Sequence, residues 1–345
     1  MNDASLPIAL LAVGAGVLLA VWGYHRWRIR RLTPPPVPPT PEAGEPPEAL
    51  TRLEPVLQPT AAAVAGEPGP RVLSPRIDAI VELRLERPVS AEAVLASMPP
   101  SRRIGSKPLA VEGWPEEAAN GDADAWEVPA PGRRYARLRV GVQLANRSGA
   151  LNEIEYSEFV QKVGQWAEHL MAAVDFPDML GVVQRARELD QFAAAHDAQL
   201  ALTLRARRTA WNPGYVTQHA LRLGFVPGTL PGRMVYPAAD GTPVVALQFE
   251  TQAALADDPE LEVLREVRLT LDVPHVPAQL APFERLRALG TALAAAMEGW
   301  IGDEAGQALT DEALDAIAAE LQRLYARLEA SGLAAGSPEA RRLFS

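Results

Sequence analysis

The segment IDAIVELRLE, residues 77–86, alternates apolar and polar side chains along most of its length, and a second alternating segment, LALTLRA, follows at residues 200–206. A period of two residues is typical of a β-strand with one buried face. A helix-start signal follows each segment: Ser90 after the first and Asn212-Pro213 after the second. The sequence therefore predicts that each segment opens a unit of the same kind.

The elements after the two opening strands recur in the same order at an offset of about 120 to 130 residues. This order predicts two tandem α+β domains, each an antiparallel sheet with helices packed against it, at 76–196 and 197–333, followed by a C-terminal tail at 334–345. The expected strands are 109–114 and 135–145 in the first domain, and 233–237, 244–250 and 266–273 in the second. The expected longer helices are 153–172 and 179–196 in the first domain, and 282–300 and 310–330 in the second.

The N-terminal region predicts a membrane anchor. Residues 4–24 carry no charge and would span about 31 Å as a helix, which matches the hydrocarbon core of a bilayer. Four arginines follow between residues 26 and 31, so the positive-inside rule places the later chain in the cytoplasm. A signal peptide would have the reverse charge order. We expect residues 1–31 to form a single-pass anchor with a periplasmic N-terminus, and a buried core helix is the alternative.

Residues 32–75 have the composition of a disordered linker. Thirteen prolines lie between residues 33 and 75, with few apolar side chains among them. Such a segment cannot bury enough surface to offset the entropy of ordering, so we expect a partly polyproline tether. A proline-rich ligand for an SH3-type domain is the alternative.

Composition and motifs argue against several functions. The chain has no cysteine, which excludes disulfides and thiol catalysis, and its formal net charge of −10 disfavours nucleic acid as a partner. It contains no P-loop, dinucleotide-binding, HExxH or GxSxG motif, and its histidines have no metal-ligand spacing. We therefore expect no catalytic residue, no metal site, no cofactor and no small-molecule substrate. A membrane-bound enzyme with dispersed acidic residues remains an alternative.

Three features of the second domain resemble the ZipA family of bacterial cell division proteins. They are the tripeptide Asp272-Val273-Pro274 at a strand end, the amphipathic helix 282–300, and the segment WIGDEAGQALT, residues 300–310, before the last helix. The N-terminal anchor and the proline-rich tether match the family layout as well. The resemblance covers the domain at 197–333, and the domain at 76–196 looks like a divergent second copy that the best-known members lack.

The resemblance implies a sheet of about six antiparallel strands with helices on one face. In the family, the other face binds the short C-terminal tail of FtsZ, which mixes apolar and acidic residues. The implied function is a non-enzymatic adaptor that anchors FtsZ filaments to the cytoplasmic face of the inner membrane at the division site. The alternative is a membrane-anchored scaffold of the same fold for a different cytoplasmic or divisome partner. Thr270 stands where the family tends to have an aromatic residue.

Strand alternation predicts which side chains face away from the helices, and several of these are arginines. Guanidinium groups could orient an acidic tail, while small residues beside them receive its apolar side chains. The alternative is that the arginines only solubilise an exposed sheet face. The candidate partner-binding residues are Ala201, Thr203, Arg205, Val244, Ala246, Gln248, Arg268 and Thr270 in the second domain, and Arg84, Arg137 and Arg139 in the first.

The charge asymmetry around residues 4–24 leads to a prediction about topology. A reporter that is active only in the periplasm should be silent when it is fused after Ser345, because the arginines keep the following chain in the cytoplasm. The same reporter fused before Met1 should be active. Activity of the C-terminal fusion would overturn the predicted orientation.

Overall fold

A computed structural model describes residues 72–118, 125–249, 263–303 and 307–345. These residues fall within one compact unit, Thr60–Ser345. The predicted anchor and residues 32–71 of the predicted linker lie outside the described residues. Within the described part, no helix combines the length and the apolar character that a membrane crossing needs. The described chain is mixed α+β, with antiparallel sheets and seven α-helices.

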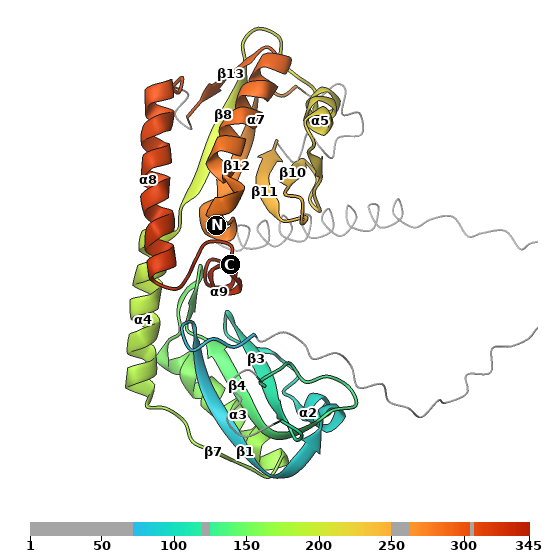
Figure 1. Cartoon of the computed structure of the whole chain (residues 1–345), viewed down its shortest axis with the longest axis vertical. Coiled ribbons are helices and arrows are strands. Elements are labelled where there is room, and N and C mark those ends of the chain that lie inside the picture. Colours follow the sequence, from blue (N-terminus) through green and yellow to red (C-terminus); the bar gives the residue numbers. More distant parts are fainter. Residues whose placement is uncertain (1–71, 119–124, 250–262, 304–306) are drawn as a thin grey trace, which may run out of the picture. The chain divides into compact units, whose positions relative to one another are not determined.

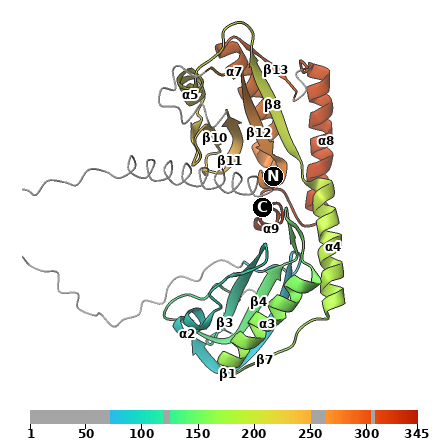
Figure 2. The same ribbon diagram turned by 180° about the vertical axis from the view of Figure 1, so that it is seen from behind.

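The first sheet has five strands in the order β2-β3-β4-β1-β7 and is covered on one face by helix α3 (Figures 1 and 2). A small two-stranded ribbon, β5 with β6, follows β4. The strands are β1 (Asp78–Ser90), β2 (Arg103–Ile104), β3 (Lys107–Pro115), β4 (Arg134–Gln143), β5 (Ala145–Asn146), β6 (Gly149–Ala150) and β7 (Ala172–Val174). The helices are α2 (Ala91–Ser97), α3 (Glu153–His169) and α4 (Met179–His196).

The second sheet has six strands in the order β13-β8-β12-β11-β10-β9, with α7 across one face (Figures 1 and 2). Its strands are β8 (Gln199–Ala206), β9 (Val226–Pro227), β10 (Arg233–Pro237), β11 (Pro243–Gln248), β12 (Glu266–Asp272) and β13 (Gly299–Gly302). The helices are α5 (Pro213–Arg222), α7 (Pro282–Ala296), α8 (Asp311–Ala330) and α9 (Pro338–Leu343), with 3₁₀ turns at Val273–His275 and Ala278–Leu280.

The two sheets share a strand order. In the first sheet β1 lies between β4 and β7, and β3 follows β4; in the second sheet β8 lies between β12 and β13, and β11 follows β12. The helices also correspond in sequence order, with α2, α3 and α4 matching α5, α7 and α8. The strands β2, β3, β4, β1 and β7 therefore correspond in order to β10, β11, β12, β8 and β13, and the second sheet has one further edge strand, β9.

The predicted helix starts are confirmed. The Ser90 side chain accepts a hydrogen bond from Ala93 N and caps α2, and the Asn212 side chain accepts from Tyr215 N at the start of α5, where Pro213 takes the first helical position. These caps are local, because the acceptor lies three residues from the donor. Local signals of this kind were therefore readable from the sequence.

The structure forms a short strand at two places where the pattern predicts none, one at the end of a predicted helix and one in a predicted connection. The helix expected to reach Trp300 ends at Ala296, Glu298 adopts a left-handed conformation with φ 52°, and Trp300 belongs to β13. The segment after the helix expected at 153–172 was predicted as a connector, but β7 pairs there with β1. Both strands are short and add to a sheet edge that the rest of the fold creates, so their own sequence gives little signal.

The C-terminal residues, predicted as a tail, form a docked helix. Ser337 caps α9, and the side chains of Ala340, Leu343 and Phe344 have no exposed surface. A helix of six residues is too short to give a clear periodic pattern in the sequence. The burial of its side chains also depends on surfaces formed by residues far away in the sequence.

Helix α4 belongs to both hydrophobic cores. Val182 and Ala186 pack in the core of the first sheet, Ala193 packs in the core of the second, and Leu189 contacts both. The helix passes into β8 after only two residues. At the boundary predicted at 196/197 the two units are therefore in apolar contact through α4, and no spacer separates them.

One buried cation of the first sheet is poorly compensated. Lys107, in β3, is 1% exposed and its Nζ donates to Ser106 Oγ at 2.6 Å. Burial lowers the pKa of the Lys107 ammonium, and Glu155 and Asp190 offset only part of that shift. The folded state therefore carries a free-energy cost whenever this lysine is protonated.

We predict that Lys107→Met raises the free energy of unfolding at pH 7, because it removes a buried ammonium whose pKa is lowered by burial. Below the lowered folded pKa both states hold the proton and the full cost remains. As the pH rises towards the ordinary value of 10.5, the unfolded state also loses its proton, so the gain should shrink. Urea unfolding, followed by tryptophan fluorescence at several pH values, measures the difference in the free energy of unfolding between the variant and the unaltered chain.

The matched control is Lys162→Met at the other lysine, which is paired with Glu158 at 2.6 Å on the surface of α3. A surface pair of this kind contributes under about 0.5 kcal/mol. Equal effects of the two substitutions, or a gain at Lys107 that does not depend on pH, would contradict the explanation.

Candidate partner-binding faces

Each sheet has one face that its covering helix leaves open. We call the face of the second sheet opposite α7 the second open face. A Cβ added at Gly290 of α7 would contact Leu202 and Leu269, so these two side chains face the helix. Their neighbours along the strands face the other way. Strand pairing places those neighbours in two rows, Ala201–Thr270–Ala246 and Thr203–Arg268–Gln248. The structure thus brings six of the eight candidates in the second domain together on one face.

Several of the candidates in the second domain are buried or already have a partner within the chain. Arg205 forms an ion pair with Glu266 at 3.2 Å and lies opposite Trp300 of β13. Thr203 is 2% exposed and its Oγ1 has no hydrogen-bond partner among the described residues. Val244 is 3% exposed and belongs to the second core. Val244 was expected to receive apolar groups of a partner, but its side chain is already packed.

The first open face is the corresponding face of the first sheet, opposite α3. Strand pairing forms the rows Ile80–Gly141–Ala110, Glu82–Arg139–Glu112 and Arg84–Arg137–Trp114. The three arginines predicted for this domain therefore lie on the expected face, and Arg84 is exposed.

Two of these arginines already have aromatic and acidic partners in the chain. The Arg137 guanidinium lies 4.3 Å from the ring centroid of Trp114, and that of Arg139 lies 4.5 Å from Trp126. Arg139 Nε donates to Glu112 Oε2 at 2.6 Å, and the two Trp rings meet edge to face at 5.4 Å. Cation–π contacts and a buried carboxylate hold the two guanidinium groups against the sheet.

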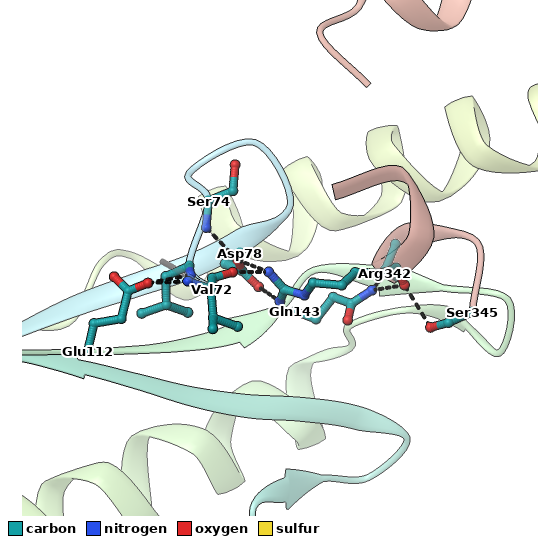
Figure 3. Close-up of polar contacts among 9 residues, drawn as sticks. Val72, Ser74, Asp78, Glu112, Gln143, Arg342 and Ser345 are labelled. Atoms are coloured by element: carbon teal, nitrogen blue, oxygen red, sulfur yellow. Dashed lines mark hydrogen bonds and ion pairs between the residues drawn. The ribbon is translucent and has the colours of Figure 1, made fainter. Parts of the chain in front are cut away.

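The chain just before β1 lies on this face (Figure 3). Glu112 Oε1 accepts hydrogen bonds from Val72 N at 2.5 Å and Leu73 N at 2.8 Å, and Asp78 Oδ2 accepts one from Ser74 N at 2.8 Å. The Leu73 side chain is 3% exposed and sits above Gly141. The linker predicted to extend to residue 75 therefore ends earlier, because Val72 begins an ordered contact with the sheet.

A buried ion pair closes this arrangement from the C-terminal side (Figure 3). Arg342 of α9 donates to both Asp78 oxygens, at 2.9 and 2.5 Å, and to Val72 O at 2.5 Å. Gln143 Nε2 donates to Arg342 O at 2.7 Å. The Asp78 side chain has no exposed surface. Burial raises the pKa of the Asp78 carboxyl, and Arg342 and the Ser74 amide oppose this shift.

Sequence reasoning missed Leu73, Glu112 and Arg342. No signal in the sequence distinguishes Leu73, because the same Val-Leu pair, Val56-Leu57, also lies between two prolines, Pro55 and Pro59. The ion pair had none either, because Asp78 and Arg342 are separated by nearly the whole folded part of the chain.

A metal site in the described part of the chain would need acidic or histidine side chains as its ligands. The described residues contain no group of three or more His, Asp or Glu side chains that could hold a metal ion. His169 and His196 each contact a backbone carbonyl of their own helix, at 2.6 and 2.7 Å, and His275 Nε2 lies 3.0 Å from Phe344 O.

We predict that Arg342→Met lowers the free energy of unfolding by about 3 kcal/mol, because it leaves the buried Asp78 carboxylate without a counter-charge. The double substitution Asp78→Asn with Arg342→Met should recover part of the loss, since no buried charge then remains. Arg341→Met, at the exposed neighbouring position, is the control and should change stability by less than about 0.5 kcal/mol. Equal effects at positions 341 and 342 in chemical unfolding would refute the role of the pair.

Comparison with known proteins leaves the question of function to the residues and their geometry. No protein-family model matches this chain, and no curated protein matches it. The resemblance to the ZipA family therefore rests on the sequence features described above. The candidate sites rest on the two sheet faces and on the side chains that the strand register places there.

Proposed function

We propose that this chain is a non-enzymatic adaptor of bacterial cell division, tethered to the inner membrane, that binds the C-terminal tail of FtsZ. In this proposal residues 1–31 anchor the chain, the proline-rich segment spaces the folded part from the membrane, and the second open face receives the tail. No cofactor, nucleic acid or small-molecule substrate is part of the proposed function.

The observation that carries the proposal is the second sheet. It has six antiparallel strands, Leu202 and Leu269 face α7, and its other face carries a row of small side chains, Ala201–Thr270–Ala246, of which Ala201 and Thr270 are partly exposed and Ala246 is buried. The resemblance to the family implies this architecture, and an extended tail could lay apolar side chains over such a row. The equivalent strand order of the first sheet supports the further proposal that residues 76–196 are a divergent copy of the same domain.

The charges on the second open face suit an acidic tail. Arg268 lies in the row next to Thr270 and is exposed, and Arg205 lies one row further along the same strands. Guanidinium groups at the rim of a contact increase the rate of association and fix the orientation of a charged peptide more than they add affinity. The protein is acidic overall, so a basic patch here would also favour this face over the rest of the surface.

A scaffold for another divisome or cytoplasmic partner is the second candidate. The polar side chains of Thr270, Gln248 and Arg268 favour it, because an apolar groove for a hydrophobic tail would carry larger apolar residues. The two candidates differ in whether FtsZ binds, and a binding experiment separates them.

We predict that the full chain, reconstituted in nanodiscs, co-sediments with polymerised FtsZ and that Thr270→Glu weakens this binding at least tenfold. The new carboxylate would repel the acidic tail and block the small-residue row, and like charges in a contact cost several kcal/mol. Binding should also fall as salt is raised, because the rim arginines act through screened charge.

Ala319→Glu is the matched control, since it adds the same charge at an exposed position of α8. It should leave co-sedimentation unchanged. Absence of binding by the unaltered chain would overturn the FtsZ proposal and favour the scaffold. Equal losses at positions 270 and 319 would show that net charge and not the second open face governs binding.

A further inference from the structure

The seat of Leu73 on the first open face depends on a glycine. A Cβ built at Gly141 would lie 2.4 Å from Leu73 Cδ2 and 3.4 Å from Ile80 Cγ1. A side chain at position 141 would therefore occupy the space that Leu73 fills. Gly141 lies within β4, where glycine weakens a strand unless another group approaches closely. The close approach of Leu73 explains its presence.

The backbone around Leu73 is held as a bound peptide would be held. Glu112 accepts two consecutive N–H groups, Asp78 accepts the next, and Arg342 donates to the Val72 carbonyl. Both carboxylates are fully buried, and each has its own arginine, Arg139 for Glu112 and Arg342 for Asp78. One apolar anchor plus saturated main-chain groups is the usual basis of binding for an extended peptide.

A row of small side chains also crosses the strands of the second sheet that correspond in order to β1, β4 and β3. The row Ile80–Gly141–Ala110 runs across β1, β4 and β3, and the row Ala201–Thr270–Ala246 runs across the matching strands β8, β12 and β11. Ala201 and Thr270 are partly exposed.

The neighbouring rows carry opposite charge. In the first sheet the next row is Glu82–Arg139–Glu112, with two carboxylates and one guanidinium; in the second it is Thr203–Arg268–Gln248, with a guanidinium only. The first seat is already filled by Leu73, whereas Arg268 in the row beside Thr270 would attract an acidic peptide.

We propose that residues Val72–Ser74 are a built-in ligand of the first open face, held there by Arg342, so that only the second open face receives an acidic, partly apolar peptide. This inference rests on the proposed function for the identity of that peptide. It assigns the two sheets different roles: the first binds the end of the tether in cis and the second binds the partner in trans.

The test locks the segment to the first sheet. The chain has no cysteine, so the double substitution Leu73→Cys with Gly141→Cys introduces the only two thiols. Mild oxidation, or a short bismaleimide, should join them within one chain and remove both free thiols. The two single-cysteine variants are the controls and should keep one reactive thiol each. Persistence of both free thiols in the double variant under either treatment would overturn the docked segment.

The locked chain is then titrated, in nanodiscs, with a fluorescent peptide of the FtsZ C-terminal tail. We expect one peptide per chain, a Kd within twofold of that of the unlocked chain, and at least a tenfold loss on adding Thr270→Glu. A tenfold loss on locking alone would mean that the peptide displaces Val72–Ser74 from the first open face, which overturns the assignment. Failure of the unaltered chain to bind the peptide would instead overturn the proposed function, whereas thiol loss still reports on the docked segment.

Discussion

The contact between Asp78 and Arg342 joins two parts of the chain that are 264 residues apart in sequence. Asp78 begins β1 and also accepts the Ser74 amide, while Arg342 belongs to the last helix and donates to the Val72 carbonyl. A buried carboxylate is costly unless it is paired and hydrogen-bonded. The pairing therefore requires that the end of the linker, the first sheet and helix α9 adopt their positions together, and the Leu73 seat depends on the same arrangement.

The second constraint is the sharing of α4 between two cores. Because Leu189 packs against both clusters, neither sheet can complete its core without the helix that leads into the other half. The two units have matching strand orders, but they share a helix and are therefore not independent domains joined by a flexible linker. Both open faces belong to one compact unit. The proposed division of roles is therefore a division between two faces of the same folded part of the chain.

The equivalent rows of the two sheets show how one architecture can support different contacts. The strand order sets which positions share a row, and the residue types set what the row can bind. Glycine at position 141 leaves space for a leucine from the same chain, whereas Thr270 lies between Ala201 and Ala246 in the second sheet. Acidic residues lie in the row beside Gly141, and Arg268 lies in the row beside Thr270.

The sequence by itself determined the opening strands, the longer helices, the caps at Ser90 and Asn212, and the face on which Thr270 and Arg268 lie, because alternation and capping act over a few residues. It could not predict β7 or β13, which form only where β1 and β8 offer a free edge. Nor could it predict that Val244 is packed, that the tether ends at Val72, or that Arg342 meets Asp78. The tertiary structure decided these, because burial and ion pairing depend on groups brought together from opposite ends of the chain.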